Sequence, residues 1–506
     1  MCQSALYHDD LDRAGVGVRV RLSKSKFIAG WQCLKRLYLQ VHQPELAPEP
    51  DEQTIAVFEQ GHEVGHWAQK KFPGGVLIKA GPEELRRALR QTERAVEDKH
   101  PAIFEATFSH GNILARVDIL QRLPRNKWRL IEVKSANSIK DYHLYDVAIQ
   151  QHILESLGMK VVPCLMHLNR DYVYDGKQYD LKRLFVMQEV TDETAALKLE
   201  VNDLIREERK VLARAKPPDI EPGSHCTRPC CCEFYDVCNK PLPVDDVANL
   251  PGITAKKLAE LATWGIQSIR KIPKTFDLND RQRHAWESAK TGKPWFGKGL
   301  KKALSELRYP LYFMDFETLG VPLPRYAGTS PYGQIPFQWS VHVQQKPGAE
   351  PEHYEFLADD SNDPRPEFIR TLCEVVGKRG SVLAYCSGFE SSCLDGLAEA
   401  VPRYKKQIRD IQRRLWDPLP VIREHVYDLA FRGSYSLKSV LPALVPEMSY
   451  EGMEVSEGSE AGLVWEKMLQ SEAGSEERRR LRAALLAYCK QDTLGMVRLI
   501  DLLRSI

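Results

Sequence analysis

Residues 113–136 read ILARVDILQRLPRNKWRLIEVKSA and decide the fold of the first half of the chain. Two strand-like runs flank the polar segment RLPRNK, a pattern that favours a β-hairpin. Side chains alternate along a strand, so Glu132 and Lys134 are expected on one face, with Asp118 opposite them on the neighbouring strand. Two carboxylates beside an ammonium suit a divalent cation that holds water against a phosphodiester. A solvated cross-strand ion pair is the alternative interpretation.

Three further residues surround this pattern. His62 lies in the helical stretch GHEVGHWAQKKF, Glu105 in the strand-like IFEATF, and Gln150 in the amphipathic YDVAIQQHILESLG. An imidazole would add a ligand to the same metal, and His62 is preferred over His66 one turn later. A buried structural histidine is the alternative for either one.

The order His62, Glu105, Asp118, Glu132-x-Lys134, Gln150 resembles the RecB-like branch of the PD-(D/E)XK nucleases. The resemblance implies that the histidine, aspartate and glutamate bind Mg²⁺ or Mn²⁺ and that the lysine is catalytic. It also implies that the glutamine helix approaches the nucleic acid. The family's Gln-x-x-x-Tyr pattern is incomplete here, because Leu154 stands at the tyrosine position.

The chain has 12 cysteines, and five of them lie in GSHCTRPCCCEFYDVC, residues 223–238. A chain of this length does not need disulfide staples, so such a group indicates a metal or cluster site. A single earlier cysteine, Cys33 in LSKSKFIAGWQCLKRLYL, resembles the split arrangement of iron–sulfur RecB-type nucleases. That resemblance implies a [4Fe-4S] cluster on one early and three late cysteines, with Zn²⁺ or unligated cysteines as alternatives. The implied ligands are Cys33, Cys226, Cys232 and Cys238, with Cys230 and Cys231 competing for the late positions.

The middle of the chain combines a turn motif with basic residues. Residues 250–273, LPGITAKKLAELATWGIQSIRKIP, resemble a helix-hairpin-helix unit whose turn amides would face a phosphate. Thr254 replaces the second turn glycine of that motif, and a plain helical linker is the alternative. Residues 270–302 then carry ten lysines and arginines against three acidic residues, which suits contact with a polyanion.

A second acidic constellation opens the last part of the chain. Asp315 and Glu317 end the apolar strand pattern PLYFMDFETLG and share one face. Tyr488 and Asp492, in AYCKQDTLGMV, are neighbours on a helix, and Glu390 begins the helix after SVLAYCSGF. Carboxylates gathered in this way are what a two-metal phosphodiester site requires.

These five residues resemble the motifs of the DEDDy exonucleases, members of the DnaQ-like group with a ribonuclease-H fold. The resemblance implies metal binding by Asp315, Glu317 and Asp492 and positioning of water by Tyr488. Glu390 stands where the family has aspartate. The stretches GTSPYGQIPFQWSVHV and GSYSLKSVLPAL further resemble an uncharacterised bacterial family, domain of unknown function 2779, over roughly residues 309–506.

Composition limits the class of protein. The chain has 506 residues, 43% hydrophobic and 28% charged, with a formal net charge of +2, so several ordered domains are expected and the whole-chain charge selects no partner. No apolar run reaches the length of a membrane helix, and the N-terminal MCQSALYHDDLDRAG lacks an apolar signal core. We therefore expect a cytoplasmic protein without membrane contact.

The sequence thus predicts a multidomain α/β chain. Its expected parts are a PD-(D/E)XK restriction-endonuclease-like domain at 20–240, a helix-hairpin-helix-like basic linker at 241–304 and a ribonuclease-H-like domain at 305–506. The expected activity is metal-dependent hydrolysis of DNA, at single strands or ends, with RNA as the other substrate considered. Repair, CRISPR adaptation and phage defence are the settings considered. No GxxxxGK[ST] loop is present, so unwinding would need a helicase partner. The alternative is a nucleic-acid-binding scaffold with one or both centres inactive.

Overall fold

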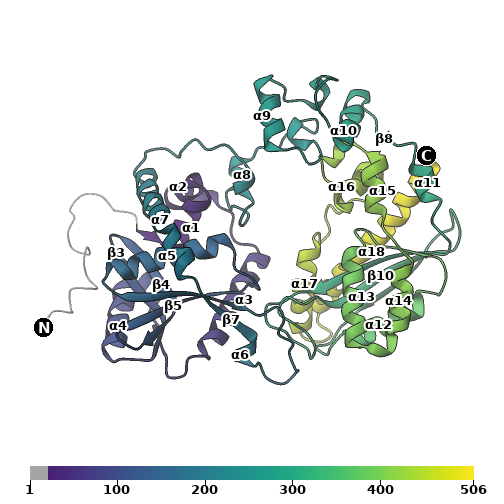
Figure 1. Cartoon of the computed structure of the whole chain (residues 1–506). Helices are drawn as coiled ribbons and strands as arrows, with labels where there is room; N and C mark the ends of the chain where they lie inside the picture. The colour runs from purple at the N-terminus through teal and green to yellow at the C-terminus, as the bar shows by residue number, and fades with distance from the viewer. Residues whose placement is uncertain (1–20) are drawn as a thin grey trace. The chain divides into compact units, whose positions relative to one another are not determined.

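The computed structural model describes residues 21–506, and the acidic N-terminal stretch considered above lies outside the described residues (Figure 1). The chain is a mixed α/β protein that divides into two compact units. Among the described residues, the first unit comprises 21–240 with 321–333, and the second comprises 241–320 with 334–506. Within residues 21–506 no helix is both long and apolar enough to cross a membrane.

The first unit is built on a seven-stranded mixed sheet in the order β2-β3-β4-β5-β6-β7, with β1 paired to β4. The predicted hairpin is confirmed, because β4 and β5 pair as antiparallel neighbours. Helix α5 connects β5 to its parallel neighbour β6. The strands are β1 (Leu22–Ser23), β2 (Val76–Leu77), β3 (Ala102–His110), β4 (Ile113–Leu123), β5 (Lys127–Lys134), β6 (Lys160–Leu168) and β7 (Phe185–Glu189).

Apolar side chains cover both faces of this sheet. The larger core includes residues of α1, α2, α4, α5 and α7, and the smaller core includes Val64 and Ala68 of α3. The helices are α1 (Lys24–Gln32), α2 (Leu34–His42), α3 (Glu52–Gln69), α4 (Leu85–Glu97), α5 (Asp141–Ser156), α6 (Leu181–Leu184), α7 (Thr191–Leu212) and α8 (Tyr235–Cys238).

The alternation of side chains along β4 breaks at Asp118. Val117 belongs to the larger core, Ile119 to the smaller core and Leu120 again to the larger core. The ladder between β4 and β5 also ends at Ile119, so the strands separate beyond that point. The Asp118 carboxylate accepts a hydrogen bond from the Val133 backbone N–H (2.7 Å) and so takes the place of a ladder carbonyl. A side chain anchored where two strands part is available to a ligand.

One buried carboxyl of the first unit has no obvious structural use. Glu208 of α7 is fully buried against the α1 backbone at Gly30, and neither of its carboxylate oxygens has a hydrogen-bond partner among the described residues. Burial raises the pKa of Glu208 to about 9. The side chain is therefore protonated in the folded protein at neutral pH.

We expect Glu208→Gln to stabilise the first unit. Because the folded-state pKa lies above the unfolded value, the unfolded chain alone releases the proton between about pH 4.5 and 9, and folding loses stability as pH rises. The amide avoids that loss, so the gain should be near zero at pH 4.5 and about 2–4 kcal/mol at pH 8. Urea unfolding at both pH values measures it, with the exposed neighbour Glu207→Gln as control. A variant less stable than the parent at pH 8 would contradict the assignment.

The second unit contains a five-stranded sheet in the order β11-β10-β9-β12-β13. Strand β10 is antiparallel to β9 and β11, whereas β12 and β13 are parallel to their neighbours. The strands are β9 (Leu311–Leu319), β10 (Ile335–Gln344), β11 (Glu352–Leu357), β12 (Ser381–Leu383) and β13 (Leu415–Trp416). Tyr312, Met314 and Phe316 of β9 enter the core formed with α12, α13 and α14, so Asp315 and Glu317 belong to the opposite face.

The C-terminal helix, α18, packs against β9 and β10 of this sheet (Figure 1). Its sequence supplies a long run of good helix formers, and the Ser475 side chain caps its start by accepting from the Arg478 backbone N–H (3.1 Å). The helices of this part are α12 (Arg365–Val375), α13 (Gly388–Ala400), α14 (Lys405–Arg413), α15 (Pro418–His425), α16 (Leu437–Leu444), α17 (Gly458–Gln470) and α18 (Glu476–Ser505).

Residues 241–304 lie in the second unit together with this sheet. They form α9 (Ala255–Thr263), α10 (Asp280–Thr291), β8 (Trp295–Phe296) and α11 (Leu300–Leu304). Strand β8 pairs with β14 (Val426–Tyr427), which joins the basic segment to the chain that follows α15. Residues 321–333 instead belong to the first unit, where the Tyr332 hydroxyl donates to the Ser135 carbonyl (2.5 Å), next to Lys134.

Candidate functional site

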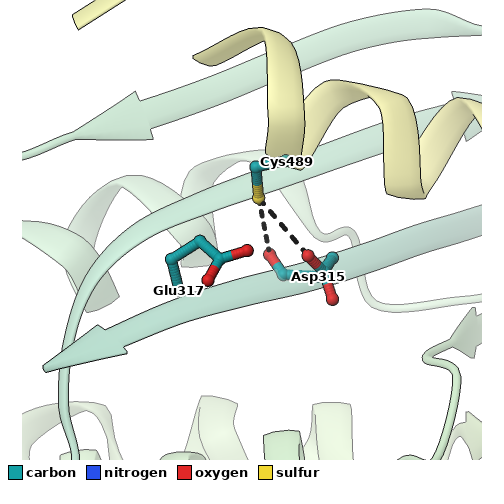
Figure 2. A group of neighbouring side chains, drawn as sticks. All are labelled: Asp315, Glu317 and Cys489. Carbon is teal, nitrogen blue, oxygen red and sulfur yellow. Dashed lines mark hydrogen bonds between the residues drawn. The ribbon is translucent and has the colours of Figure 1, made fainter. Parts of the chain in front are cut away.

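An acidic cluster occupies the face of β9 that meets α18. Ligand atoms of Asp315, Glu317 and Cys489 all lie within 4.8 Å of one another (Figure 2). The Cys489 thiol donates to the Asp315 side chain (Oδ2, 3.5 Å) and also lies 3.7 Å from the Asp315 backbone carbonyl. Glu317 and Cys489 are buried, and Asp315 is partly buried. The cluster combines two carboxylates from one strand with a thiol from a helix.

Two tyrosines and an aspartate extend this cluster. The Tyr450 hydroxyl donates to Asp492, and Asp492 interacts with the hydroxyl of Tyr488, one helical turn earlier on α18. The Lys438 ammonium lies over the rings of both tyrosines, 5.8 Å from the Tyr450 centroid and 5.2 Å from the Tyr488 centroid. The structure thus brings together the four residues that the sequence predicted from the strand and the last helix.

Burial and, after it, repulsion between neighbouring carboxylates raise the pKa values of the acids in this cluster. Burial, followed by the charges of Asp492 and Glu317, raises the pKa of Asp315 well above its usual value. Burial and the charge of Asp492 do the same to the pKa of Glu317. Burial raises the pKa of Asp492 to about 6 although Tyr450 and Lys438 oppose that rise. Because one ammonium faces several carboxylates, the site favours a bound cation.

Glu390 lies in the first turn of α13 and is buried near the same acids. Its charge contributes to the raised pKa of Asp315 and Glu317, and its Oε2 atom has no hydrogen-bond partner among the described residues. Burial raises the pKa of Glu390 itself to about 8. The loop before it is fixed by Asp417, which accepts from the backbone N–H groups of Cys386 and Ser387, both at 3.0 Å.

The predicted acidic site of the first unit is a network of carboxylates and lysines. Glu132 accepts from Lys134 (2.9 Å), from Lys24 (2.7 Å) and from the Gln150 amide (2.8 Å). Lys134 also pairs with Asp146 of α5. Asp118, Glu132, Lys134 and Gln150 therefore gather as predicted, joined by two residues that the sequence analysis did not include.

The environment of this network shifts the pKa values of Asp118 and Glu132 in opposite directions. Burial and then the charge of Glu132 raise the pKa of Asp118 to about 7. Burial opposes ionisation of Glu132 too, but Lys134 and Lys24 outweigh it and hold its pKa below the usual range. Burial opposes protonation of Lys134, but Asp146 and Glu132 outweigh it and raise its pKa. The lysine is a firmly charged ammonium in this arrangement.

Two predicted members stand apart from the network. His62 is exposed on α3, and among residues 21–506 no ion pair or hydrogen bond joins it to Asp118 or Glu132; His66 is exposed as well. Glu105 forms an ion pair with Arg116 (2.7 Å). Its φ of +59° is unusual for a residue with a side chain and coincides with an interruption of the β3–β4 ladder opposite Asp118.

The four cysteines that the resemblance implied line one cavity. Cys33, Cys226, Cys232 and Cys238 surround it together with Lys35 and Arg36. Cys230 is not part of the lining, although its thiol lies 3.7 Å from the Arg36 guanidinium, and Cys231 is exposed. No three of the four thiols lie within 4.8 Å of one another in the described part of the chain, although thiolates on a single zinc would be about 3.8 Å apart.

Helix α1 connects this cavity to the acidic network. Lys24 is its first residue, and Cys33 directly follows its last residue, Gln32. The Gln32 amide donates to the carbonyls of His225 (2.7 Å) and Cys230 (2.9 Å), so the late cysteine segment is bound to the same helix. The same helix thus carries Lys24 at its start and is hydrogen-bonded to the cysteine segment at its end.

Five side chains of these sites were not predicted from the sequence. Asp146 could have been found, because it precedes Gln150 by four residues and shares its face of α5. Cys489 directly follows Tyr488 in the same helical motif. Lys24, Lys438 and Tyr450 carry no local pattern that points to an acid site. The five are Lys24, Asp146, Lys438, Tyr450 and Cys489.

Comparison with known proteins adds a family for part of the chain. Residues 312–436 match the family described as a domain of unknown function (DUF2779), which confirms that resemblance over about a quarter of the chain. No curated protein matches the sequence. The solved structure titled "Crystal structure of SSO0001" is similar at 16% identity over 45% of this chain and 90% of that chain, with a TM-score of 0.22, too low to support an argument.

Proposed function

We propose that the chain is a metal-dependent nuclease with two centres for phosphodiester hydrolysis, one in each unit. The observation that carries the proposal is the acidic cluster of the second unit, where Asp315, Glu317 and Asp492 converge from a strand and a distant helix. Single-stranded DNA or DNA ends are the proposed substrate, and RNA is the alternative. The proposed location is the cytoplasm, with a helicase as a candidate partner.

Strand order supports a fold for each unit. The order β11-β10-β9-β12-β13, with only β10 antiparallel to the central β9, supports a ribonuclease-H-like fold for the second unit. The hairpin β4–β5, followed by a crossover helix and the parallel strand β6, supports a PD-(D/E)XK-like fold for the first. In both, the proposed acids lie on or beside central strands. Residues 250–273 remain the proposed helix-hairpin-helix-like segment.

The donor sets fit divalent cations in different degrees. In the second unit the acids are close together and poorly compensated, so Asp315, Glu317 and Asp492 would hold Mg²⁺ or Mn²⁺. In the first unit Asp118 and Glu132 would hold the cation, but two lysines already compensate Glu132. Such a cation neutralises charge on the phosphate and promotes ionisation of water.

The protein's own groups then divide the remaining work. Burial raises the pKa of Tyr488, so its hydroxyl stays protonated. Because its proton is directed at Asp492, the hydroxyl oxygen can orient a water by accepting from it. Tyr450 holds Asp492 in place. In the first unit, the Lys134 ammonium next to Glu132 can position water and offset the negative charge of the phosphate. Gln150 restrains the other oxygen of Glu132.

We also propose a [4Fe-4S] cluster on Cys33, Cys226, Cys232 and Cys238, with Zn²⁺ as the alternative. The four thiols line one cavity, which supports a single group held by all of them. Its proposed role is structural: it would tie the late cysteine segment to α1 and thereby fix Lys24.

We expect Cys238→Ser to remove the brown colour of protein purified without oxygen and to lower the melting temperature of the first unit by about 10 °C or more. Absorbance near 400 nm and calorimetry measure the two effects. The exposed neighbour Cys231→Ser is the matched control and should change neither. A colourless parent protein that contains stoichiometric zinc would instead support the zinc site.

The function itself is tested with single-stranded oligonucleotides labelled at either end, incubated with Mg²⁺ or Mn²⁺ or with a chelator. Cation-dependent digestion that requires Asp315 or Lys134 supports the proposal, and the two labels report the direction of cleavage. Tight binding without digestion of DNA or RNA would reject the nuclease and favour a nucleic-acid-binding scaffold. The main argument for such a scaffold is that Glu390 stands where the DEDDy exonucleases have an aspartate.

A further inference from the structure

A cavity of the second unit lies outside the acidic cluster. Its wall is formed by the turn at Gly252, the start of α10 and the chain around α15 and Tyr435. These segments are far apart in the sequence, and none of them carries a residue assigned above to metal binding or catalysis. The turn at Gly252 belongs to the proposed helix-hairpin-helix-like segment, residues 250–273, whereas the other parts of the wall lie outside that segment.

Two arginines on its wall have no protein partner. Arg281 and Arg423 line the cavity with exposed side chains, and in the described part of the chain neither forms an ion pair or a hydrogen bond. Asp280 is the one acidic residue of the lining. Surface arginines usually find a carboxylate or remain scattered, whereas two guanidinium groups on one cavity create a local positive potential.

A tyrosine of the same cavity has an unused hydrogen-bonding group. The Tyr435 side chain is only 8% exposed, and its hydroxyl has no partner among residues 21–506. Its ring packs edge-on against Tyr427 and Phe431, with centroids 5.9 and 6.0 Å away, and its carbonyl accepts from Tyr385 (2.6 Å). Burial raises the pKa of Tyr435 to about 12 while the two arginines oppose that rise. The hydroxyl is thus a fixed donor beside two cations.

The backbone adds to the same potential. Helix α10 has 12 residues and starts at the cavity, with Asn279 capping it by accepting from the Gln282 N–H (3.0 Å). A helix start carries partial positive charge. Gly252 has φ +59° and open space where a side chain would stand, so a ligand can approach its backbone closely.

We propose that this cavity binds a phosphate group of the nucleic-acid strand through the Arg281 and Arg423 guanidinium groups and the Tyr435 hydroxyl. The planar guanidinium fork matches phosphate oxygens, and a neutral donor completes the set. This inference rests on the proposed nuclease function and adds a site that holds the strand away from the cleaved bond.

The test measures binding of a fluorescent 12-nucleotide single strand in Ca²⁺, with the full-length protein, across salt concentrations. The double variant Arg281→Gln/Arg423→Gln is expected to bind about tenfold more weakly and to reduce the salt slope by about 0.7 for each phosphate that is no longer neutralised. Tyr435→Phe is expected to weaken binding about threefold. The exposed pair Arg403→Gln/Arg413→Gln, in the same unit, is the control and should change neither quantity.

Two further arms identify the source of the phosphate. Equal decreases in affinity for 5′-hydroxyl and 5′-phosphorylated strands support an internal phosphodiester, and a decrease confined to the phosphorylated strand supports a terminal phosphate. Unchanged affinity and slope in the double variant, or an equal effect of the control pair, would overturn the site. If the parent protein binds no strand, the nuclease proposal fails, and the phosphate site is then tested separately by titration with inorganic phosphate. Phosphate binding by the parent that the double variant abolishes would support the site. No phosphate binding by the parent would reject it.

Discussion

An Asp315→Asn variant is expected to lose at least about 10³-fold of the cation-dependent cleavage by the second unit, because it removes a central metal ligand. The same change should stabilise the metal-free protein. Burial and neighbouring acids raise the pKa of Asp315, so its ionised form opposes folding above about pH 4. We expect a gain of about 1–3 kcal/mol at pH 7.5 that disappears below pH 4.

Cleavage assays and calorimetry with and without Mg²⁺ measure both effects. Asp395→Asn, a half-exposed acid on α13 that pairs with Arg409, is the control and should leave cleavage unchanged. The cation should raise the melting temperature of the parent more than that of Asp315→Asn. A variant that loses stability together with activity would mean that the carboxylate is structural, and the acid-cluster argument would fail.

Local periodicity predicted the acidic residues well because each pair lies within one element. Two residues of a strand share a face, and two residues four apart on a helix are neighbours, so Asp315 with Glu317 and Tyr488 with Asp492 required only short-range geometry. The hairpin that joins Asp118 to Glu132 was also predicted from local sequence, because its polar turn can be recognised between the two strand patterns.

Residues that enter a site from elsewhere in the chain could not be predicted in this way. Lys24 reaches Glu132 from the start of α1, and its ammonium is placed by how that helix packs. His62 illustrates the opposite failure: the helix exists as predicted, but Val64 and Ala68 face the core, which leaves the histidine exposed. Glu105 sits at a backbone irregularity that alternation cannot anticipate.

The cysteines fall between these cases. Their spacing indicated that Cys33 and the late group belong together, and they line one cavity, but the choice among Cys226, Cys230, Cys231 and Cys232 depended on side-chain direction. That direction follows from the turn around residues 226–232 and its bonds to Gln32 and Arg36. The sequence of three consecutive cysteines does not show which of their side chains face the cavity.

Lys134→Met is expected to reduce cleavage by the first unit about 10²–10³-fold and to destabilise that unit by about 3–5 kcal/mol in the absence of metal. The buried carboxylates of Glu132 and Asp146 and the partly buried carboxylate of Asp118 would then face the single ammonium of Lys24. A divalent cation can offset the excess negative charge, so Mg²⁺ or Ca²⁺ should restore most of the stability but not the activity. Calorimetry with and without cation, beside the cleavage assay, separates the two effects.

Lys24→Met provides the sharpest comparison, because Lys24 binds the same Glu132 oxygen (2.7 Å) and also lies 3.7 Å from Asp146. If Lys24 mainly balances charge, its removal should destabilise the metal-free unit to a similar extent, while cleavage with Mg²⁺ falls only about tenfold. The difference in activity between the two variants then measures what the ammonium of Lys134 contributes beyond its charge. Equal decreases in activity would assign both lysines to the chemical step, whereas full activity of Lys134→Met would remove the first unit from the proposed nuclease.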